Sequence, residues 1–162
     1  KKWKGRARKW STKRDFFSDY PKIFVYLQKE HTKKNIGMEI KSTFDHLNIN
    51  VTDLERSIAF YEKALGLKEA KRKEASDGSF ILVYLGDDSG HFLLELTWLR
   101  DKEGAYELGD NETHLCLRVE GDYDAVREYH REMGCICYEN HKMGLYFIND
   151  PDDYWIEVLP KK

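Results

Sequence analysis

The sequence predicts an α+β fold in which two βαβββ modules form a cleft. The order strand, helix and three strands occurs twice, over residues 44–98 and 113–160, with residues 99–112 as a linker. Each opening strand carries a histidine, and each closing strand carries a glutamate in an apolar run. The chain therefore divides into an N-terminal basic extension, 1–43, and a duplicated domain, 44–160.

The first opening strand is FDHLNINV, Phe44 to Val51. Polar and apolar residues alternate along it, as a half-buried strand requires, and the polar face holds His46, Asn48 and Asn50. A helix follows, because apolar residues recur at helical spacing from Leu54 to Leu65. We expect Thr52 and Glu55 to form its capping box and Gly66 to end it.

Three further strands complete the first module. The turns between them are rich in Gly, Asp and Ser, and the expected strands are Leu67–Lys73, Ser79–Leu85 and His91–Trp98.

The second module repeats this order. It opens with THLCLRV, Thr113 to Val119, and continues with a helix that ends at Gly134. One face of this helix is marked by Tyr123, Val126, His130 and Met133. The remaining strands are Cys135–Glu139, Leu145–Ile148 and Tyr154–Leu159.

The closing stretch YFINDPDDYWIEVLP places Glu157 within WIEVL, a strand that is apolar on both faces. An ionised carboxylate there costs several kcal/mol unless a cation or hydrogen-bond donors receive it. The alternative is a Glu at a strand end that points to solvent. Glu95 in FLLELTW has the same apolar setting in the first module.

Composition limits the class of protein. A chain of 162 residues suits one domain, or two small halves, and it contains no run of roughly 20 apolar residues. We therefore expect no membrane span. The basic segment at its front leads us to expect no secretory signal. Three cysteines without zinc-ribbon spacing indicate a reduced, cytoplasmic protein. We expect these cysteines to fill the core: Cys116, Cys135 and Cys137.

The net charge of −2 conceals an asymmetry. Residues 1–42 hold 13 Lys or Arg against 4 Asp or Glu, while residues 43–162 hold 14 against 25. The acidic body argues against nucleic acid as a partner. For the basic segment, one expectation is an extension before an ancestral start near Met38, and the other is a docking arm for an anionic partner.

Two histidines and two glutamates occupy matching places in the modules. His46 precedes Glu95 by 49 positions, and His114 precedes Glu157 by 43. If the modules pack around a pseudo-twofold axis, the four converge on one point. Two imidazoles and two carboxylates suit Ni(II), Zn(II), Co(II) or Fe(II). The other histidines lack such pairing and are expected at the surface or in turns: His31, His91, His130 and His141.

Four segments carry a family resemblance: HLNINVTDLERSIAFYEKALGLK, LLELTW, THLCLRV and FINDPDDYWIEVLP. They resemble the signature regions of glyoxalase I, within the vicinal oxygen chelate superfamily, over about residues 44–160. The resemblance implies a metal cleft and a homodimer in which two chains build each site. The compact spacing resembles the Ni(II)- or Co(II)-activated glyoxalases more than the Zn(II) class, and Zn(II) stays possible.

The resemblance also implies a reaction on a small molecule. The hemithioacetal of methylglyoxal and a thiol is converted to a lactoyl thioester, with the metal as Lewis acid. Glu157 matches the family position of the base that moves the proton, and Glu95 is its symmetric partner. Aromatic residues are expected either to line the cleft or to pack in the core: Phe44, Trp98 and Trp155.

The sequence departs from the family pattern in two places. Asn50 stands where an Arg usually helps to bind a carboxylate of glutathione, and Arg118 is placed to supply that charge from the second module. The thiol is therefore glutathione or another small thiol such as bacillithiol. Asp153 replaces the usual Gly of the DPDG turn, a change of local backbone preference.

Three alternatives remain at this stage. A thiol transferase or dioxygenase of the same fold needs only His46, His114 and Glu157, which leaves Glu95 unexplained. A metal-free resistance protein that binds a small molecule has no reason to keep four ligand-type residues in register. A carbon-acid epimerase is expected to carry Gln at position 95.

Overall fold

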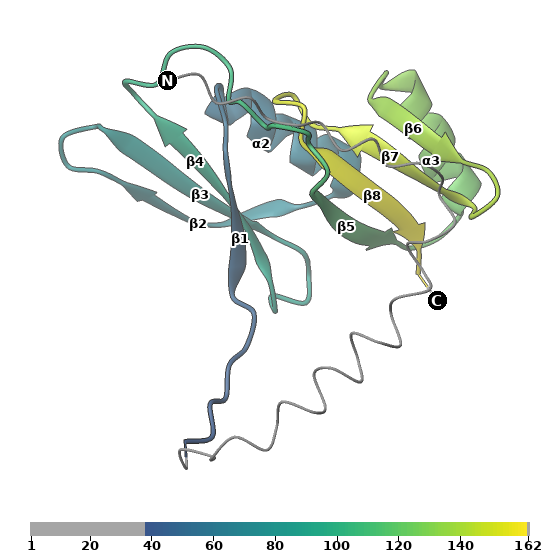
Figure 1. Cartoon of the computed structure of the whole chain (residues 1–162), viewed down its shortest axis with the longest axis horizontal. Helices are drawn as coiled ribbons and strands as arrows, with labels where there is room; N and C mark the ends of the chain where they lie inside the picture. Colours follow the sequence, from purple (N-terminus) through teal and green to yellow (C-terminus); the bar gives the residue numbers. More distant parts are fainter. Residues whose placement is uncertain (1–37, 162) are drawn as a thin grey trace, which may run out of the picture. The chain divides into compact units, whose positions relative to one another are not determined.

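The computed structural model describes residues 38–161, and expectations about the segment before Met38, including His31, lie outside these residues. Thr43–Lys162 forms one compact unit that carries two four-stranded sheets (Figure 1). The first sheet has the order β1-β4-β3-β2 and the second the order β5-β8-β7-β6. The predicted α+β duplication is confirmed.

The elements follow the predicted order closely. The first module contains β1 (His46–Asn50), α2 (Leu54–Leu65), β2 (Lys68–Glu74), β3 (Phe80–Gly86) and β4 (Leu93–Leu99). The second module contains β5 (His114–Val119), α3 (Tyr123–Glu132), β6 (Ile136–Asn140), β7 (Leu145–Asn149) and β8 (Trp155–Pro160).

The strand register shows that the duplication is structural. β1 pairs with β4 in parallel, and Asn48 lies opposite Glu95. β5 pairs with β8 in parallel, and Cys116 lies opposite Glu157. In both modules the residue opposite the glutamate is two positions after the histidine, so both histidines share a sheet face with their glutamates.

The start of α2 differs from the expected capping box. Asp53 is the N-cap, and its carboxylate accepts a hydrogen bond from the backbone N–H of Arg56 at 3.1 Å. Thr52 donates both its backbone N–H and its hydroxyl to the Asp152 carboxylate of the second module. The capping-box prediction was wrong because Thr52 is held by this contact between modules. Gly66 ends the helix in the left-handed conformation (φ 69°), as predicted.

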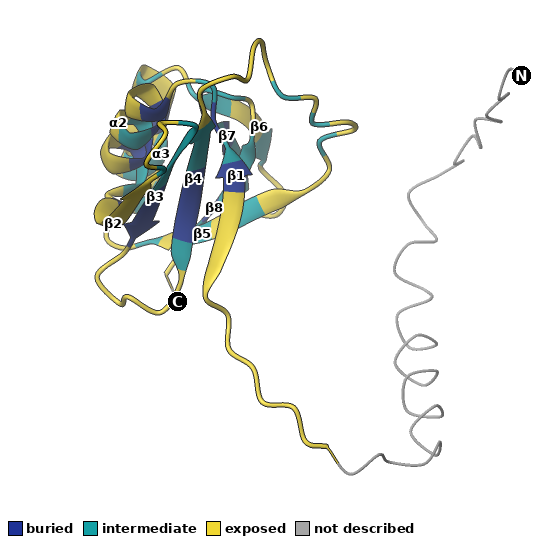
Figure 2. Cartoon of the chain, turned by 90° about the vertical axis from the view of Figure 1, so that its left-hand side faces the viewer, coloured by how far each residue is buried: buried dark blue, intermediate teal, exposed yellow. Residues whose placement is uncertain are grey.

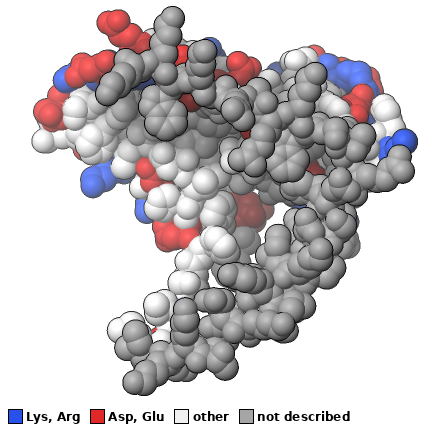
Figure 3. All heavy atoms as spheres, viewed as in Figure 1, with Lys and Arg blue, Asp and Glu red and all other residues white. Residues whose placement is uncertain are grey.

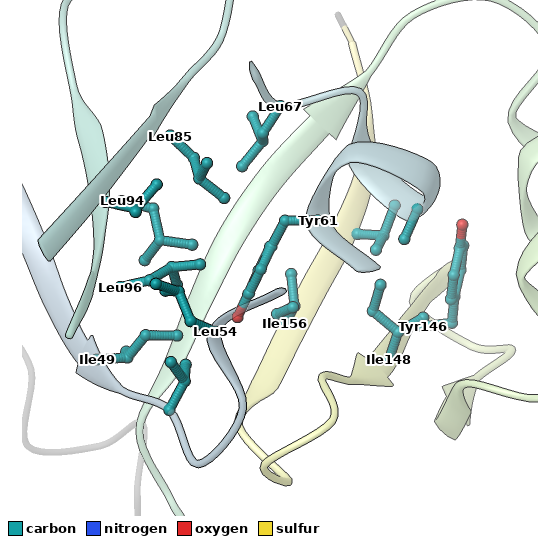
Figure 4. Close-up of a cluster of buried hydrophobic side chains, with 14 residues drawn as sticks. Ile49, Leu54, Tyr61, Leu67, Leu85, Leu94, Leu96, Tyr146, Ile148 and Ile156 are labelled. Carbon is teal, nitrogen blue, oxygen red and sulfur yellow. The ribbon is translucent and has the colours of Figure 1, made fainter. Parts of the chain in front are cut away.

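The two modules share one hydrophobic core, in which Tyr61 of α2 is central. Figure 4 shows Tyr61 between leucines of the first sheet and isoleucines of the second. Its hydroxyl donates to the Asp150 carboxylate at 2.9 Å. Burial raises the pKa of Asp150 and also that of Tyr61, whose hydroxyl lies beside that carboxylate. The α2 helix therefore fastens the closing turn of the second module to the first.

His130 of α3 makes the reciprocal contact and is fully buried, which contradicts the predicted surface position. Its Nε2 lies 2.7 Å from the carbonyl oxygen of Ala64, and its Nδ1 lies 2.9 Å from the hydroxyl of Tyr146. A carbonyl only accepts, so Nε2 carries the proton and Nδ1 accepts from Tyr146. Ala64, whose carbonyl accepts from Nε2, belongs to the first module, whereas His130 and Tyr146 belong to the second. The exposed positions expected for His91 and His141 are confirmed.

Exposure distinguishes the edge strands from the strands between them. Figure 2 shows β4 largely buried, whereas β1 is exposed over most of its length. β5 is also an edge strand, and its exposed residues alternate with half-buried ones. One edge of each sheet in this chain is thus exposed beside a candidate ligand histidine.

The described surface mixes both signs of charge. Where grey atoms do not cover it, the face in Figure 3 shows acidic and basic side chains interspersed. Within residues 38–161, neither helix has the length and apolarity that a membrane span requires.

Candidate metal and active site

His46 and Glu95 meet on neighbouring strands of the first sheet. The Nε2 atom of His46 lies 3.3 Å from Oε2 of Glu95. Nδ1 of the same ring lies 2.6 Å from the Asp45 carboxylate, and this hydrogen bond lowers the pKa of Asp45. A histidine that binds a metal through one nitrogen usually gives the other to such a partner. His46 and Asp45 therefore have the arrangement of a metal-binding histidine and the carboxylate that orients it, with Nε2 left on the side of Glu95.

His114 and Glu157 repeat this arrangement in the second sheet. Their Nε2 and Oε2 atoms are 3.5 Å apart. The Glu157 side chain is 17% exposed and stands in the middle of β8, so it is not a solvent-facing residue at a strand end. The same two atom types meet in both modules.

An aromatic ring supports each histidine from the same place in its sheet. Tyr84 lies opposite Glu95 and contacts His46 edge-on, with ring centroids 5.6 Å apart. Phe147 lies opposite Glu157 and contacts His114 edge-on at 5.2 Å. These rings limit the rotation of the imidazoles and extend the symmetry beyond the four candidate ligands.

The spacing within each pair fits a shared metal ion. Ligand bonds of about 2.0–2.2 Å place neighbouring donor atoms roughly 3 to 3.5 Å apart. The observed distances of 3.3 and 3.5 Å fall in that range. Imidazole and carboxylate are suitable donors for divalent transition metals. Each pair thus fits half of a four-donor site.

The four residues do not meet within one chain. Among residues 38–161, no group of three or more His, Cys, Asp or Glu side chains is close enough to hold a metal ion. Two hollows, of about 640 and 360 Å³, are lined by other residues. The expected convergence on one point is therefore absent from a single chain, which brings together two separate pairs.

Three aromatic residues were expected either to line the cleft or to pack in the core, and the structure places them differently. Trp98 packs against the core, and it lies on the face of β4 opposite to that of Glu95. This position fits the core-packing alternative, since residues three apart on a strand face opposite sides. Trp155 packs against Phe147, with the centroids of these two rings 5.4 Å apart, and Phe147 in turn contacts His114. Phe44 is 90% exposed.

The two residues expected to bind the thiol lie on their predicted strands. Asn50 is half-buried at the end of β1. Arg118 is exposed on β5, and its guanidinium donates to the carbonyl of Pro160 at 2.8 Å. That bond leaves most of its donors available to an anion.

The expectation that the cysteines fill the core holds in part for Cys135, which packs against the core, and is wrong for the other two. Cys116 and Cys137 are exposed, and Cys135 is half-buried. Cys116 is the residue opposite Glu157. Partial burial of its sulfur, together with a hydrogen bond to that carboxylate, raises the pKa of this otherwise exposed residue to about 11. The thiol is therefore protonated at neutral pH and donates weakly to Glu157.

Sequence reasoning also missed Asn48 and Thr97. The Asn48 amide donates to Oε1 of Glu95 at 3.1 Å, and the Thr97 hydroxyl donates to the same oxygen at 3.1 Å. Strand alternation carried a signal for both, since Asn48 is two residues after His46 and Thr97 is two after Glu95.

Paired βαβββ modules with matching His and Glu residues on parallel strands define a class of two-module α+β proteins. Comparison with known proteins agrees with this class. Residues 43–158 match the model of the Glyoxalase/Bleomycin resistance protein/Dioxygenase superfamily, and the chain belongs to that superfamily.

Individual relatives narrow the comparison. Lactoylglutathione lyase of Neisseria meningitidis serogroup A is 35% identical over 124 residues, which are 72% of this chain and 89% of the relative. The corresponding enzyme of Escherichia coli O157:H7 is 32% identical over 126 residues, 72% of this chain and 91% of the relative.

A solved structure supports the same placement. The trypanothione-dependent glyoxalase I of Leishmania major aligns with a TM-score of 0.63 and 32% identity, covering 71% of this chain and 84% of that one. The comparisons confirm the predicted family and fold. They also confirm the predicted class of enzyme, a lyase of the glyoxalase I type.

Proposed function

We propose that the chain is a metal-dependent glyoxalase I-type lyase that converts the hemithioacetal of methylglyoxal and a small thiol to a lactoyl thioester. The observation that carries the proposal is the pair of matching His Nε2–Glu Oε2 contacts at 3.3 and 3.5 Å. The similarity to lactoylglutathione lyases supports the reaction. The alternative, a thiol transferase or dioxygenase with three metal ligands, leaves Glu95 without a role.

The proposed ligands are His46, Glu95, His114 and Glu157. When bound, a divalent ion supplies Lewis-acid polarisation of the two vicinal oxygens of the substrate, which makes the carbon-bound proton more acidic. Ni(II) or Co(II) is proposed first, with Zn(II) as the alternative. The two imidazoles and two carboxylates position the ion, and the aromatic rings beside them restrict their motion.

Glu157 is proposed as the base. Its carboxylate would accept the proton from the carbon that bears sulfur and deliver it to the neighbouring carbon, while the hydroxyl proton passes to the neighbouring oxygen, which gives the thioester. The net change is an isomerisation without an oxidant or reductant. Glu95 is proposed as the symmetric ligand.

A second chain is proposed to complete the site. The two His–Glu pairs are separate in one chain, and each lies near an edge strand, β1 or β5. Leu47 on β1 is 40% exposed, and an edge strand with exposed apolar residues favours pairing with another chain. In a homodimer, the first pair of one chain and the second pair of its partner supply four donors.

The thiol is proposed to be glutathione or another small thiol with a carboxylate. Arg118 is proposed to bind that carboxylate, because Asn50 carries no charge and Arg118 is exposed on the same strand face as His114. Bacillithiol is the comparison that tests this choice.

Metal loading and turnover test the proposal together. Purified protein is expected to hold about one divalent ion per chain by elemental analysis, and to turn over the hemithioacetal when loaded with Ni(II), Co(II) or Zn(II). Sedimentation is expected to give a dimer at micromolar concentration. Protein that binds none of these metals, or that loads and turns over no adduct of glutathione or bacillithiol, contradicts the proposed function.

A further inference from the structure

The two oxygens of Glu95 have different surroundings. Oε1 accepts from the Asn48 amide and from the Thr97 hydroxyl, each at 3.1 Å, while Oε2 faces His46. Asn48 also contacts the Thr97 hydroxyl at 2.5 Å, so the two donors support each other. Glu95 is only 8% exposed. Oε1 is therefore held by two donors, and Oε2 faces the candidate metal position beside His46. The Tyr84 hydroxyl also hydrogen-bonds this carboxylate, which raises the pKa of Tyr84.

The matching carboxylate in the second module is held differently. The register places Cys116 at the position equivalent to Asn48, and Leu159, two residues after Glu157, takes the place of Thr97. A thiol is a weak donor, and a leucine has none. Within residues 38–161, no amide or hydroxyl donates to Glu157. Its carboxylate is less constrained than that of Glu95.

We infer that Asn48, supported by Thr97, is a positioning residue that fixes Glu95 as a one-oxygen metal ligand. This inference rests on the proposed function. Hydrogen bonds from amide and hydroxyl donors to Oε1 keep the carboxylate from rotating and orient Oε2 toward His46. Glu157 lacks these donors and keeps the freedom that a residue transferring a proton between two carbons requires. The pseudo-symmetric site thus contains one fixed carboxylate and one mobile carboxylate.

Metal affinity is the first readout. We expect Asn48→Leu, which keeps side-chain volume but removes the donor, to weaken Ni(II) binding to the metal-free full-length chain by roughly 10–100-fold in calorimetric titration. Thr97→Val is expected to cause a smaller loss in the same direction. Asn48→Gln keeps the amide and is expected to restore part of the affinity. The melting temperature without metal separates this effect from a loss of folding.

The second test places an amide donor beside Glu157 and measures both Ni(II) affinity and kcat. Cys116→Asn gives Glu157 the amide that Glu95 has, so we expect Ni(II) affinity to be kept or increased while kcat falls. Cys137→Asn is the matched control, since Cys137 is also an exposed strand cysteine but lies on β6. This control is expected to leave both quantities within about twofold of the wild-type chain.

The outcomes separate this inference from the proposed function. Wild-type protein that binds no metal or has no turnover contradicts the proposed function itself. If the wild-type chain is active and both Asn48→Leu and Thr97→Val melt normally with unchanged Ni(II) affinity, Asn48 does not position Glu95. A Cys116→Asn chain with undiminished kcat shows that freedom of Glu157 is not required. If Asn48→Leu fails to fold, Thr97→Val and Cys116→Asn decide the question.

Discussion

The two modules have the same plan and differ in how each holds its glutamate. Glu95 is buried and accepts from an amide and a hydroxyl, whereas Glu157 is more exposed and has a thiol beside it. The rings beside the histidines also differ. Tyr84 lies under the Lys71 ammonium at 4.0 Å, and Phe147 belongs to an aromatic cluster with Trp155. Duplication accounts for the two His–Glu pairs, and the side chains around the two glutamates have diverged.

The modules also differ in what each contributes to their junction. The first supplies the hydroxyl of Tyr61 to Asp150, and the second supplies the imidazole of His130 to the Ala64 carbonyl. Both contacts cross between modules and both are buried. The junction therefore fixes the relation between the two sheets, and hence between the two His–Glu pairs of a chain.

The largest expected effect distinguishes the two glutamates. Glu157→Gln is expected to lower kcat by about 10²–10⁴-fold, because the substitution removes the proposed base. Glu95→Gln is expected to act mainly on metal affinity and to cost less at saturating metal. Steady-state kinetics with Ni(II), alongside metal titration, measures both quantities. Glu132→Gln on the exposed face of α3 is the control. Full activity in a metal-loaded Glu157→Gln chain contradicts the assignment of the base.

The second effect concerns the junction. Tyr61→Ala removes a fully buried aromatic side chain between the two sheets, and we expect it to lower the free energy of unfolding by about 3–5 kcal/mol. Urea unfolding of the full chain measures this loss. Tyr129→Ala, at a 40% exposed position of α3, is expected to cost much less. Equal losses in the two variants contradict the central place of Tyr61 in the shared core.

A finer change isolates the polar part of that contact. Tyr61→Phe keeps the ring and removes only the hydroxyl, which leaves the buried Asp150 carboxylate without one of its three donors. We expect a loss of about 1–3 kcal/mol, measured by urea unfolding against Tyr129→Phe. A Tyr61→Phe chain as stable as wild type shows that backbone donors alone satisfy Asp150.

Much of this plan could be predicted from the sequence, because it depends on local periodicity. Each strand of the duplicated unit lies within two residues of its expected bounds, since alternation and turn formers act over a few residues. Matching places in the repeat identified the four residues His46, Glu95, His114 and Glu157. Within residues 38–161 they form two pairs instead of the expected single cluster.

The errors fall where a contact crosses from one element to another. The partner of Thr52 is Asp152, and the partner of His130 is Ala64; both lie in the other module. No local rule indicates such partners.

The smallest expected effect is a pH dependence that comes from His130. Burial lowers its pKa below the value of about 6.5 expected in the unfolded chain. The titratable groups around it are Tyr146, which donates to Nδ1, and the nearby Tyr129 and Cys135; none of them supplies a negative charge at neutral pH. Protonation of Nδ1 would replace an acceptor by a donor opposite the Tyr146 hydroxyl.

The sign follows from proton binding in the two states. Above pH 6.5 both states hold a neutral imidazole, so His130 adds no pH dependence. As the pH falls through about 6.5, the unfolded chain takes up a proton that the folded chain does not, and stability decreases until the folded pKa is reached. We expect the melting temperature to fall between pH 7 and 5.5 more in the wild-type chain than in His130→Gln. His141→Gln, an exposed control, should keep the wild-type profile. If His130→Gln and wild type lose stability in parallel, the pH dependence originates elsewhere; NMR titration of the His130 ring gives the same test without a substitution.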